Sequence, residues 1–241
     1  MIEYRKIAEK IKEADAILVG ASNGFSITEG LNLFANNDSF HRLFGDFEQK
    51  YGIQNILQGF FFQWPTEEEH WAFTSRLISH YSCSYTGSPV MDALKKILSE
   101  APYFIITSNG ENHFELAGLD PARILEIEGS WKEMRCNRGC HDTLYPTWTA
   151  VVRITEHEKN GHVPTELLPR CPKCGGPMTV NFQPKKVQIQ AYQHFVEKYH
   201  NKKLLVLELG IGARNQLIKA PLMRLVDQEP EAFYITFNKG E

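Results

Sequence analysis

Four cysteines, arranged as two close pairs, constrain this chain more than any other feature of its sequence. Three residues separate Cys136 from Cys140, two separate Cys171 from Cys174, and thirty residues lie between the pairs. Zn²⁺ prefers four soft ligands at tetrahedral corners, and two tight turns bring four thiolates to one ion at low cost in backbone adjustment. Four unrelated cysteines would rarely be paired in this way, and the remaining composition argues against a secreted disulfide framework. The spacing therefore predicts one zinc site.

The predicted zinc site is structural, because four thiolates complete the coordination sphere and leave no open position for water or substrate. His141, directly after Cys140, could replace a cysteine as ligand, although four sulfurs already suffice. The surrounding residues 131–185 contain several prolines and glycines and too few apolar residues for a core of their own. A metal ion is the expected source of stability for such a small module.

The composition is that of an ordinary soluble globular protein, with 42% hydrophobic and 23% charged residues. A formal net charge of −3 gives no electrostatic basis for binding nucleic acid or an anionic membrane. No stretch is long and apolar enough to cross a bilayer, and the N-terminal residues 1–6 lack the apolar core of a signal peptide. Of the five cysteines only Cys83 is left without a metal, and no cationic neighbour activates it. We expect a cytoplasmic protein.

Short apolar runs alternate with amphipathic helical patterns along much of the chain, and such runs are typical of parallel strands buried on both faces. The five predicted strands are Ala16–Val19, Tyr103–Ile106, Ile124–Ile127, Leu204–Leu207 and Phe233–Phe237. A helix is predicted over Pro89–Leu98, with Ser88 as its cap. A second helix precedes Leu204, and its predicted buried face consists of Val187, Ala191, Phe195 and Tyr199. This alternation predicts an α/β fold with a Rossmann-like, doubly wound parallel sheet.

Two segments interrupt the alternation. Residues 32–86 contain no convincing strand but many aromatic residues, including Phe60–Phe62 and Trp64, so we expect a helical insertion in which these rings mainly form core. Residues 131–185 are the predicted zinc-binding module. The remaining residues 1–31, 87–130 and 186–241 would then make up the Rossmann-like domain.

Polar, glycine-containing loops follow four of the predicted strands, at the carboxyl edge where ligands of such sheets bind. The loops are Gly20–Ser26, Thr107–His113, Glu128–Trp131 and Glu208–Asn215. The first has the strand, glycine turn and helix that let backbone N–H groups approach a pyrophosphate. Ser22 occupies the second glycine of the common G-x-G-x-x-G spacing, so this loop alone could equally be a simple tight turn. The four loops together predict one nucleotide cleft.

Two other residues of these loops have open roles. His113 could belong to the site, but we expect it to face solvent. Arg214, beside the late glycine loop, could pair with a phosphate or form a surface salt bridge.

In their order, these motifs resemble those of the sirtuins over nearly the whole chain. The opening of the family's Gly-Ala-Gly-Ala-Ser loop is similar to Gly20–Ser26, and its Thr-Gln-Asn-Ile-Asp segment, followed by Ala-Gly, is similar to Thr107–Gly118. Its His-Gly-Ser aligns with Glu128–Ser130. The two cysteine pairs, a late loop at Gly210–Gly212 and a last strand ending in asparagine at Ile235–Asn238 follow in the family's order.

The resemblance implies NAD as co-substrate and structural zinc as the metal. The residues that it implies for NAD binding are Gly20, Ala21, Ser22, Gly24, Thr107, Ser108, Asn109, Glu111, Gly210, Gly212 and Asn238. It implies catalytic roles for Glu128 and Asn109, the latter holding the nicotinamide ribose or a water molecule. The zinc ligands that the spacing predicts, Cys136, Cys140, Cys171 and Cys174, match the family's two knuckles.

The departures from the family pattern favour one branch of it. Glu128 stands where the family's deacylases have their catalytic histidine, Ser108 replaces the glutamine and Glu111 the aspartate, and the Asp-Phe-Arg of the first loop is not evident near Leu31. The macrodomain-linked, or class M, sirtuins also lack that histidine, although a glutamine is usual at the position of Glu128. They are similar to this chain in the C-x₃-C knuckle and in the Glu-Leu-Gly-x-Gly of the late loop. That branch implies protein ADP-ribosylation, with a lipoyl-carrier protein as target and a macrodomain hydrolase as a further partner.

Three outcomes remain open for the chemistry. A carboxylate such as Glu128 near the ribose hydroxyls could stabilise developing positive charge and then deprotonate a nucleophile. A protein nucleophile would give ADP-ribosylation, water would give NAD hydrolysis, and an acyl-lysine oxygen would give deacylation without the family's histidine. A strand-end carboxylate bonded to a loop N–H is the alternative for Glu128. In that case the chain would be an NAD or ADP-ribose sensor without turnover.

Overall fold

The computed structural model describes residues 4–239, so that residues 1–3 and 240–241, at the ends of the predicted Rossmann-like domain, lie outside the described residues. Two compact units make up the chain, and we describe each by itself. The sheet unit comprises Met1–Leu31, Thr86–Gly129 and Gln183–Glu241, and the cysteine unit comprises Asn32–Tyr85 and Ser130–Phe182. The proposed division into domain, insertion and module stays a prediction.

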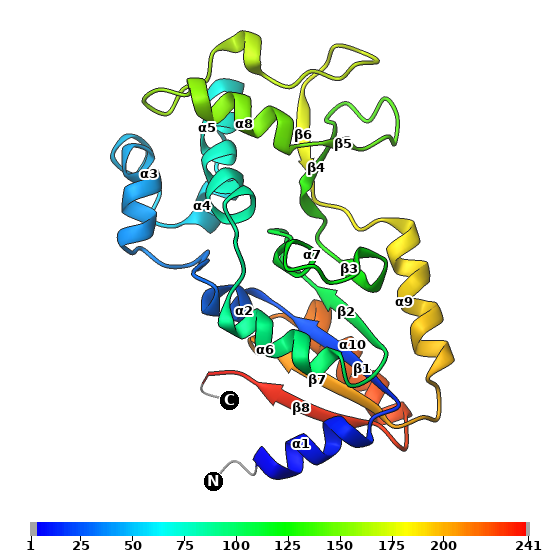
Figure 1. The fold of residues 1–241 in the computed structure, drawn as a ribbon. Helices are drawn as coiled ribbons and strands as arrows, with labels where there is room; N and C mark the ends of the chain where they lie inside the picture. Colours follow the sequence, from blue (N-terminus) through cyan, green and yellow to red (C-terminus); the bar gives the residue numbers. More distant parts are fainter. Residues whose placement is uncertain (1–3, 240–241) are drawn as a thin grey trace. The chain divides into compact units, whose positions relative to one another are not determined.

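The sheet unit is built on five parallel strands in the order β3-β2-β1-β7-β8 (Figure 1). The strands are β1 (Ala16–Ala21), β2 (Tyr103–Thr107), β3 (Ile124–Glu126), β7 (Leu204–Leu209) and β8 (Phe233–Phe237). All five coincide with the apolar runs in the sequence, and the predicted α/β fold is confirmed. Because both faces of the sheet are covered, its central strands need no alternation of polar and apolar residues.

Helices cover both faces of this sheet. Ile17 and Val19 of β1 pack with α6 (Pro89–Leu98) and the partly buried face of α1 (Tyr4–Glu13). Ala16 and Leu18 point the other way and pack with α9 (Lys186–Lys198) and α10 (Gln216–Gln228). The unit also contains three short helices, α2 (Asn23–Thr28), α7 (His113–Leu116) and the 3₁₀ turn η2 (Pro121–Arg123). Every residue of β1 is buried, as expected for the central strand.

The two predicted helices of the sheet unit are present, one with a different buried face. Helix α6 begins as the sequence predicts, because the Ser88 side chain accepts a hydrogen bond from the Met91 N–H and Pro89 opens the helix. In α9, Ala191, Phe195 and Tyr199 pack against the sheet, but Val187 is 66% exposed. A step of four residues advances about 40° beyond a full helical turn. Val187, three steps before Tyr199, therefore leaves the buried face, and Gln188 is buried instead.

The cysteine unit combines helices with a small sheet. Its helices are α3 (Asp38–Tyr51), α4 (Ile56–Phe61), α5 (Glu67–Ile78), the π-helical turn η1 (Ser79–Cys83), α8 (Trp148–His157) and the 3₁₀ turn η3 (Thr165–Leu167). A three-stranded antiparallel sheet has the order β5-β4-β6, formed by β5 (Tyr145–Pro146), β4 (Ser130–Cys136) and β6 (Met178–Asn181). Helices thus fill the segment predicted as a helical insertion.

Aromatic rings form much of the interior of the cysteine unit. Phe73 of α5 lies 4.5 Å from Phe44 and 5.2 Å from Trp64, measured between ring centroids. Aromatic pairs at such distances add about 1 kcal/mol each beyond the area that they bury. Phe44 and Phe73 are buried, as expected for core, whereas Phe60, Phe62 and Trp64 are half-buried and Phe61 is 81% exposed.

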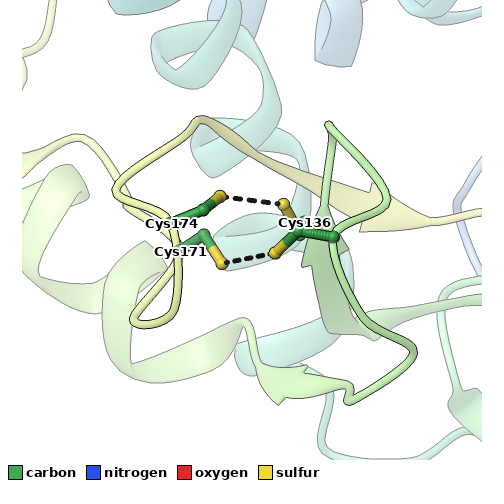
Figure 2. Close-up of side chains that lie close together, drawn as sticks. Cys136, Cys171 and Cys174 are labelled. Carbon is green, nitrogen blue, oxygen red and sulfur yellow. Dashed lines mark hydrogen bonds between the residues drawn. The ribbon is translucent and has the colours of Figure 1, made fainter.

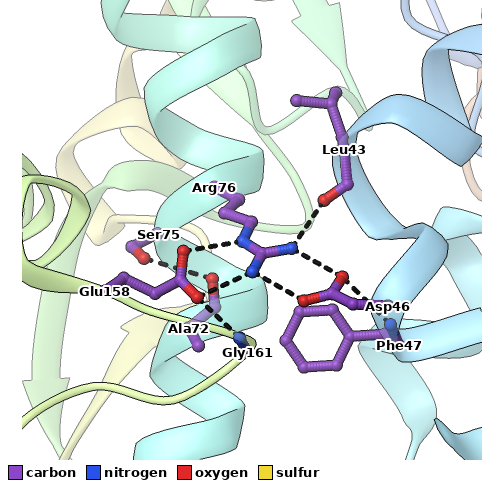
Figure 3. A network of polar contacts seen from close by, with 8 residues as sticks. All are labelled: Leu43, Asp46, Phe47, Ala72, Ser75, Arg76, Glu158 and Gly161. Atoms are coloured by element: carbon purple, nitrogen blue, oxygen red, sulfur yellow. Dashed lines mark hydrogen bonds and ion pairs between the residues drawn. The ribbon is translucent and has the colours of Figure 1, made fainter.

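Arg76 ties three parts of the cysteine unit together (Figure 3). Its guanidinium donates to both carboxylate oxygens of Asp46 in α3, at 2.7 Å each, and to the Leu43 carbonyl. It also donates to both oxygens of Glu158, which follows α8, at 2.9 and 2.7 Å, and it lies over the Phe47 ring. Burial alone would lower the pKa of Arg76, but these hydrogen bonds raise it. The arginine thus links α3, α5 and the end of α8.

No helix within residues 4–239 combines the length and the hydropathy needed to cross a membrane.

Candidate functional site

The last residues of the five parallel strands form one row across the sheet. Register pairs Glu126 of β3 with Thr107, Thr107 with Ala21, Ala21 with Leu209, and Leu209 with Phe237 of β8. Each predicted site loop of the sheet unit leaves from this row. Because the strands are parallel, all of these loops meet at one edge, which is the edge where such sheets bind ligands (Figure 1).

Three side chains from three loops meet just beyond the row. Ser108 Oγ lies 3.0 Å from Ser22 Oγ, and Asn215 Nδ2 donates to Ser22 Oγ at 2.9 Å and to Ser108 Oγ at 3.3 Å. Asn109 Nδ2 donates to the Ser22 carbonyl at 3.1 Å, while the Asn109 N–H is held by the Thr107 hydroxyl. Sequence reasoning did not single out Asn215, whose only signal was its place at the end of a glycine-containing loop.

Two asparagines at this edge keep unused acceptors. Among the described residues, no group donates a hydrogen bond to Oδ1 of Asn23 or to Oδ1 of Asn215, although both atoms are buried. Buried acceptors without partners cost free energy, so they fit a ligand that supplies N–H or O–H groups. The edge is neutral in character where these amides and hydroxyls lie, and it is suited to a ligand rich in hydroxyl groups.

The backbones of the first and last loops touch at two glycines. The Gly24 N–H donates to the Gly210 carbonyl at 2.9 Å, and a Cβ added to Gly24 would lie 2.5 Å from that oxygen. Gly210 has φ +60°, a left-handed conformation that favours glycine. Gly20, in contrast, lies within β1, and a Cβ there would clash with the Leu222 side chain of α10. The structure therefore gives Gly20 a packing role, and a Gly20→Val substitution would disturb the core as well as any ligand.

The remaining late residues lie at the same edge. Asn238 follows β8, and its Nδ2 donates to the Ile211 carbonyl at 3.0 Å. This hydrogen bond anchors the loop that follows β7. Gly212 is exposed, and nothing lies within 4 Å of the position of its Cβ. Arg214 is exposed as well. Gly212 and Arg214 are thus on the open side of the loop that carries Asn215.

Glu128 lies two residues beyond β3 and is exposed. Among the described residues its carboxylate forms no hydrogen bond or ion pair, unlike the alternative of a carboxylate bonded to a loop N–H. Partial burial raises the pKa of Glu128. Glu126, two residues earlier, is buried and accepts hydrogen bonds from Asn112 and, at 3.2 Å, from Gln188. Glu128 is thus the available carboxylate of this loop, and Glu126 is the structural one.

The second loop is tied to the first through buried polar groups. Ser26 Oγ donates to Glu111 Oε1 at 2.6 Å, and burial raises the pKa of Glu111. His113 was expected to face solvent, but it is only 3% exposed, and its Nδ1 lies 2.8 Å from Glu29 Oε2. The polarity of histidine suggested exposure. No sequence pattern indicated that Glu29, 84 residues earlier, contacts His113 in the folded chain.

The four cysteines of the cysteine unit come together as their spacing predicts. Their sulfur atoms all lie within 4.8 Å of one another, with Cys136 to Cys174 and Cys140 to Cys171 at 3.6 Å (Figure 2). Four sulfurs at about 2.3 Å from a tetrahedral Zn²⁺ would be about 3.8 Å apart, so the donor set fits this ion in number, type and spacing. The metal site is closed, and it is of the structural kind.

Two tight turns hold these sulfurs. Gly139 and Gly175 have φ of +62° and +65°, and their N–H groups donate to the carbonyls of Cys136 and Cys171. The Cys140 backbone N–H lowers the pKa of the Cys136 thiol to about 6, whereas burial raises that of Cys140 to about 12. Such a cluster ionises fully only when a cation is bound.

His141 stays outside the sulfur cluster. Its Nδ1 lies 2.9 Å from Cys140 Sγ, and its Nε2 lies 2.8 Å from the Tyr145 hydroxyl. A second-layer contact of this kind orients a metal ligand. The histidine therefore supports Cys140 and does not replace it.

Comparison with curated proteins finds two relatives. A protein from Staphylococcus aureus named protein ADP-ribosyltransferase is 33% identical over 257 residues, covering 99% of this chain and 80% of the relative. A Fusarium oxysporum protein is named probable bifunctional ADP-ribose hydrolase/ADP-ribosyltransferase and is 27% identical over 223 residues. The matched region covers 85% of this chain and 36% of the Fusarium protein. No protein-family model matches the chain.

Solved structures share the fold at low sequence identity. A Sir2 homologue in complex with NAD has a TM-score of 0.62 at 15% identity and covers 98% of this chain and 83% of its own. A Sir2 enzyme bound to a propionylated peptide has a TM-score of 0.56 at 15% identity, with coverage of 100% and 88%. At such identities the likeness establishes the fold alone.

Proposed function

This chain belongs to the sirtuin family of protein ADP-ribosyltransferases, and we propose on that premise that it cleaves NAD and transfers ADP-ribose to a protein. The observation that carries the proposal is the row of strand ends, with polar groups of separate loops gathered just beyond it. A dinucleotide needs backbone N–H groups for its pyrophosphate and side-chain partners for its ribose hydroxyls, and this edge offers both.

The proposed NAD site uses the first, second and late loops. The contact between Gly24 and Gly210 holds the first and late loops together, and the N–H groups at the start of α10 favour the negative charge of the pyrophosphate. The unused acceptors of Asn23 and Asn215 suit ribose hydroxyls. Ala21, Thr107 and Ser108 would line the floor, because they lie in or directly after the central strand ends.

Glu128 and Asn109 are the proposed catalytic residues. Asn109 would hold the nicotinamide ribose, and Glu128 would stabilise positive charge as the bond between nicotinamide and C1′ breaks. Nicotinamide leaves with the bonding electron pair. A nucleophile of the target then bonds to C1′, and its proton passes to Glu128. The raised pKa makes Glu128 a better proton acceptor than an ordinary glutamate.

The zinc ion would have no part in this chemistry. Cys136, Cys140, Cys171 and Cys174 supply four thiolate ligands, and the bound ion would stabilise the fold of the cysteine unit. Any effect of metal loss on activity would therefore follow from loss of folded protein.

For the target, the proposal extends to a lipoylated carrier protein, with a macrodomain hydrolase as the enzyme that reverses the modification. The resemblance to class M sirtuins supports this assignment, and the Fusarium relative, named as both hydrolase and transferase, is consistent with such a pairing. Cytoplasmic location stays a prediction.

Two other functions remain distinguishable. Deacylation would need a base where the family's histidine is missing, and a sensor would bind NAD or ADP-ribose without turnover. Neither is favoured by a specific observation in the site, whereas the unpaired Glu128 carboxylate favours turnover.

Nicotinamide release tests the proposal. The wild-type protein should release nicotinamide from NAD when cell extract supplies the target, and Glu128→Ala should lower that rate about 10²-fold while NAD affinity is retained. The matched control is Glu126→Gln, which should alter stability more than turnover because Glu126 is bonded within the protein. Equal rates for wild type and Glu128→Ala would favour the sensor. Release coupled to loss of acetyl groups from lysine peptides would favour the deacylase.

A further inference from the structure

A buried hydrogen-bonded network beside the proposed NAD site takes no part in the reaction described above. It consists of Glu29, His113 and Ser88, which belong to three separate segments of the sheet unit. We infer that the Glu29–His113 pair is a positioning element for NAD: it holds α2 against the second loop, so that both loops present their ligand contacts together. This inference rests on the proposed function, because it concerns the same site.

Three side-by-side contacts join α2 to the second loop. Ser26 donates to Glu111 at 2.6 Å, Glu29 pairs with His113 at 2.8 Å, and the Phe25 ring stacks on Phe114 with centroids 5.3 Å apart. The Ser88 hydroxyl donates to Glu29 Oε1 at 2.6 Å, the carboxylate oxygen that His113 does not contact. Since Ser88 also caps α6, the network ties α2 to a long helix of the unit.

Helix α2 needs such outside support. It has six residues, and its N-cap Ser22 forms no side-chain cap. Helices this short are not stable by themselves in water. Yet α2 carries Gly24 and follows Ser22, two of the proposed NAD contacts, so its placement decides where those contacts lie.

Burial makes the pair indispensable to the local arrangement. The Glu29 side chain is 0% exposed and that of His113 is 3% exposed. A buried carboxylate that loses one of its hydrogen-bond donors is less well compensated for desolvation, and the chain would move to bring Glu29 to water. Glu29 directly follows α2, so that movement would displace the helix and with it the first loop.

The experiment compares NAD saturation curves for nicotinamide release. His113→Leu should raise the KM for NAD about tenfold, the cost of removing one hydrogen-bond partner from the buried Glu29 carboxylate, with kcat altered much less. His113→Asn should stay near the wild-type KM, because the asparagine amide can donate from the position of Nδ1. A second His–Glu pair, His200 with Glu229 at 2.7 Å, lies before the amino end of β7, and its histidine is 62% exposed. His200→Leu should leave KM unchanged.

A double variant separates positioning from plain stability. Glu29→Leu with His113→Leu replaces both partners by apolar groups, which restores thermal stability when no charge is left unpaired. The KM should remain raised, because the directed link is still absent. Two outcomes would overturn this inference but leave the proposed function standing. One is a double variant with wild-type stability and wild-type KM, and the other is a folded His113→Leu protein with wild-type KM. A wild-type protein that neither binds NAD nor releases nicotinamide would overturn both this inference and the proposed function.

Discussion

The two units of this chain reach stability by different physical means. In the sheet unit, Ile17, Leu18 and Val206 are fully buried, and helices close over both faces of one continuous sheet. The cysteine unit has two short β-strand pairings, clustered aromatic rings, one arginine between two carboxylates, and four sulfurs around a common centre. The first unit is held mainly by non-directional burial, and the second adds a few directed contacts to a buried core of its own, which includes Trp71, Phe44 and Ile154.

This difference has a consequence for how each unit tolerates change. Apolar burial is spread over many side chains, so a single loss costs a few kcal/mol at most sites. A metal site or a buried ion pair concentrates its contribution in one place, and removing one partner leaves the others uncompensated. Polar residues can therefore gather at the edge of the sheet unit without endangering its fold.

The largest expected effect is loss of the metal. Cys171→Ser should abolish zinc binding and unfold or aggregate the cysteine unit, because structural zinc contributes about 10 kcal/mol in small modules. Metal analysis of protein purified without chelators, together with circular dichroism, measures both effects. Cys83→Ser is the matched control and should bind one equivalent of zinc, because Cys83 lies outside the sulfur cluster. A stable Cys171→Ser protein would show that the unit does not need its metal.

A smaller effect is expected at the arginine network. Arg76→Met leaves Glu158 and Asp46 without their cation and should lower the free energy of unfolding by about 2–3 kcal/mol, since Asp46 is partly exposed and screened. Chemical denaturation measures this change. Arg170→Met removes a pair in which both side chains are 43% exposed and should cost less than about 1 kcal/mol. Equal effects of the two substitutions would remove the distinction between concentrated and dispersed contacts.

Two glycines probe the sheet unit. Gly24→Ala places a methyl group 2.5 Å from the Gly210 carbonyl and should weaken NAD binding about tenfold or more by separating the two loops. Gly212→Ala meets no atom within 4 Å and should leave stability unchanged. Calorimetric titration with NAD and thermal melting together separate the two outcomes. If Gly24→Ala melted the whole unit, the glycine contact would belong to the core and not to the site.

The smallest effect is a pH dependence. The pKa of Glu111 is raised in the folded protein by burial, against the opposing influence of His113 and the Ser26 hydroxyl, with Glu29 adding to the rise. Above the unfolded pKa near 4.5 the unfolded chain releases this proton while the folded chain keeps it. The free energy of unfolding should therefore fall with rising pH, by at most about 1.4 kcal/mol per pH unit for one proton.

Glu111→Gln isolates that contribution. The slope of stability against pH should become more positive in this variant than in the wild-type protein, starting near pH 4.5 and levelling once the folded carboxyl has ionised. Urea denaturation at several pH values measures it. If the plots of unfolding free energy against pH were parallel for the two proteins, Glu111 would have the same pKa in the folded and unfolded states.

Much of this arrangement was accessible from the sequence. Five apolar runs became the five parallel strands because strands buried on both faces carry an unbroken apolar signal. The four cysteines were accessible because ligand spacing is local, and helix α6 because its cap and its first proline are adjacent residues. Predictions of this kind depend on contacts within a few residues.

The rest depends on contacts between distant residues. No local pattern relates Glu29 to His113, or Arg76 to Glu158, which lie 84 and 82 positions apart. The role of Asn215 could not be predicted, because it depends on the contact between the first and last loops at Ser22. Val187 was assigned to the wrong face because a four-residue repeat drifts around a helix. Such errors arise wherever tertiary contacts, and not local preference, decide a side chain's surroundings.

The pairing order of the sheet also has a bearing on the moment at which this protein becomes active. Central strand β1 pairs with β7, and Ala16 lies opposite Leu204. During synthesis this pairing cannot form until Leu204 has been added to the chain. Contacts of such long sequence separation fold slowly, because a large loop must close before they form. Ser22 and Asn215 cannot meet until then, and in a nascent chain the proposed NAD site is incomplete. A truncated or stalled product would therefore leave cellular NAD untouched, and modification of the target begins only with the finished fold.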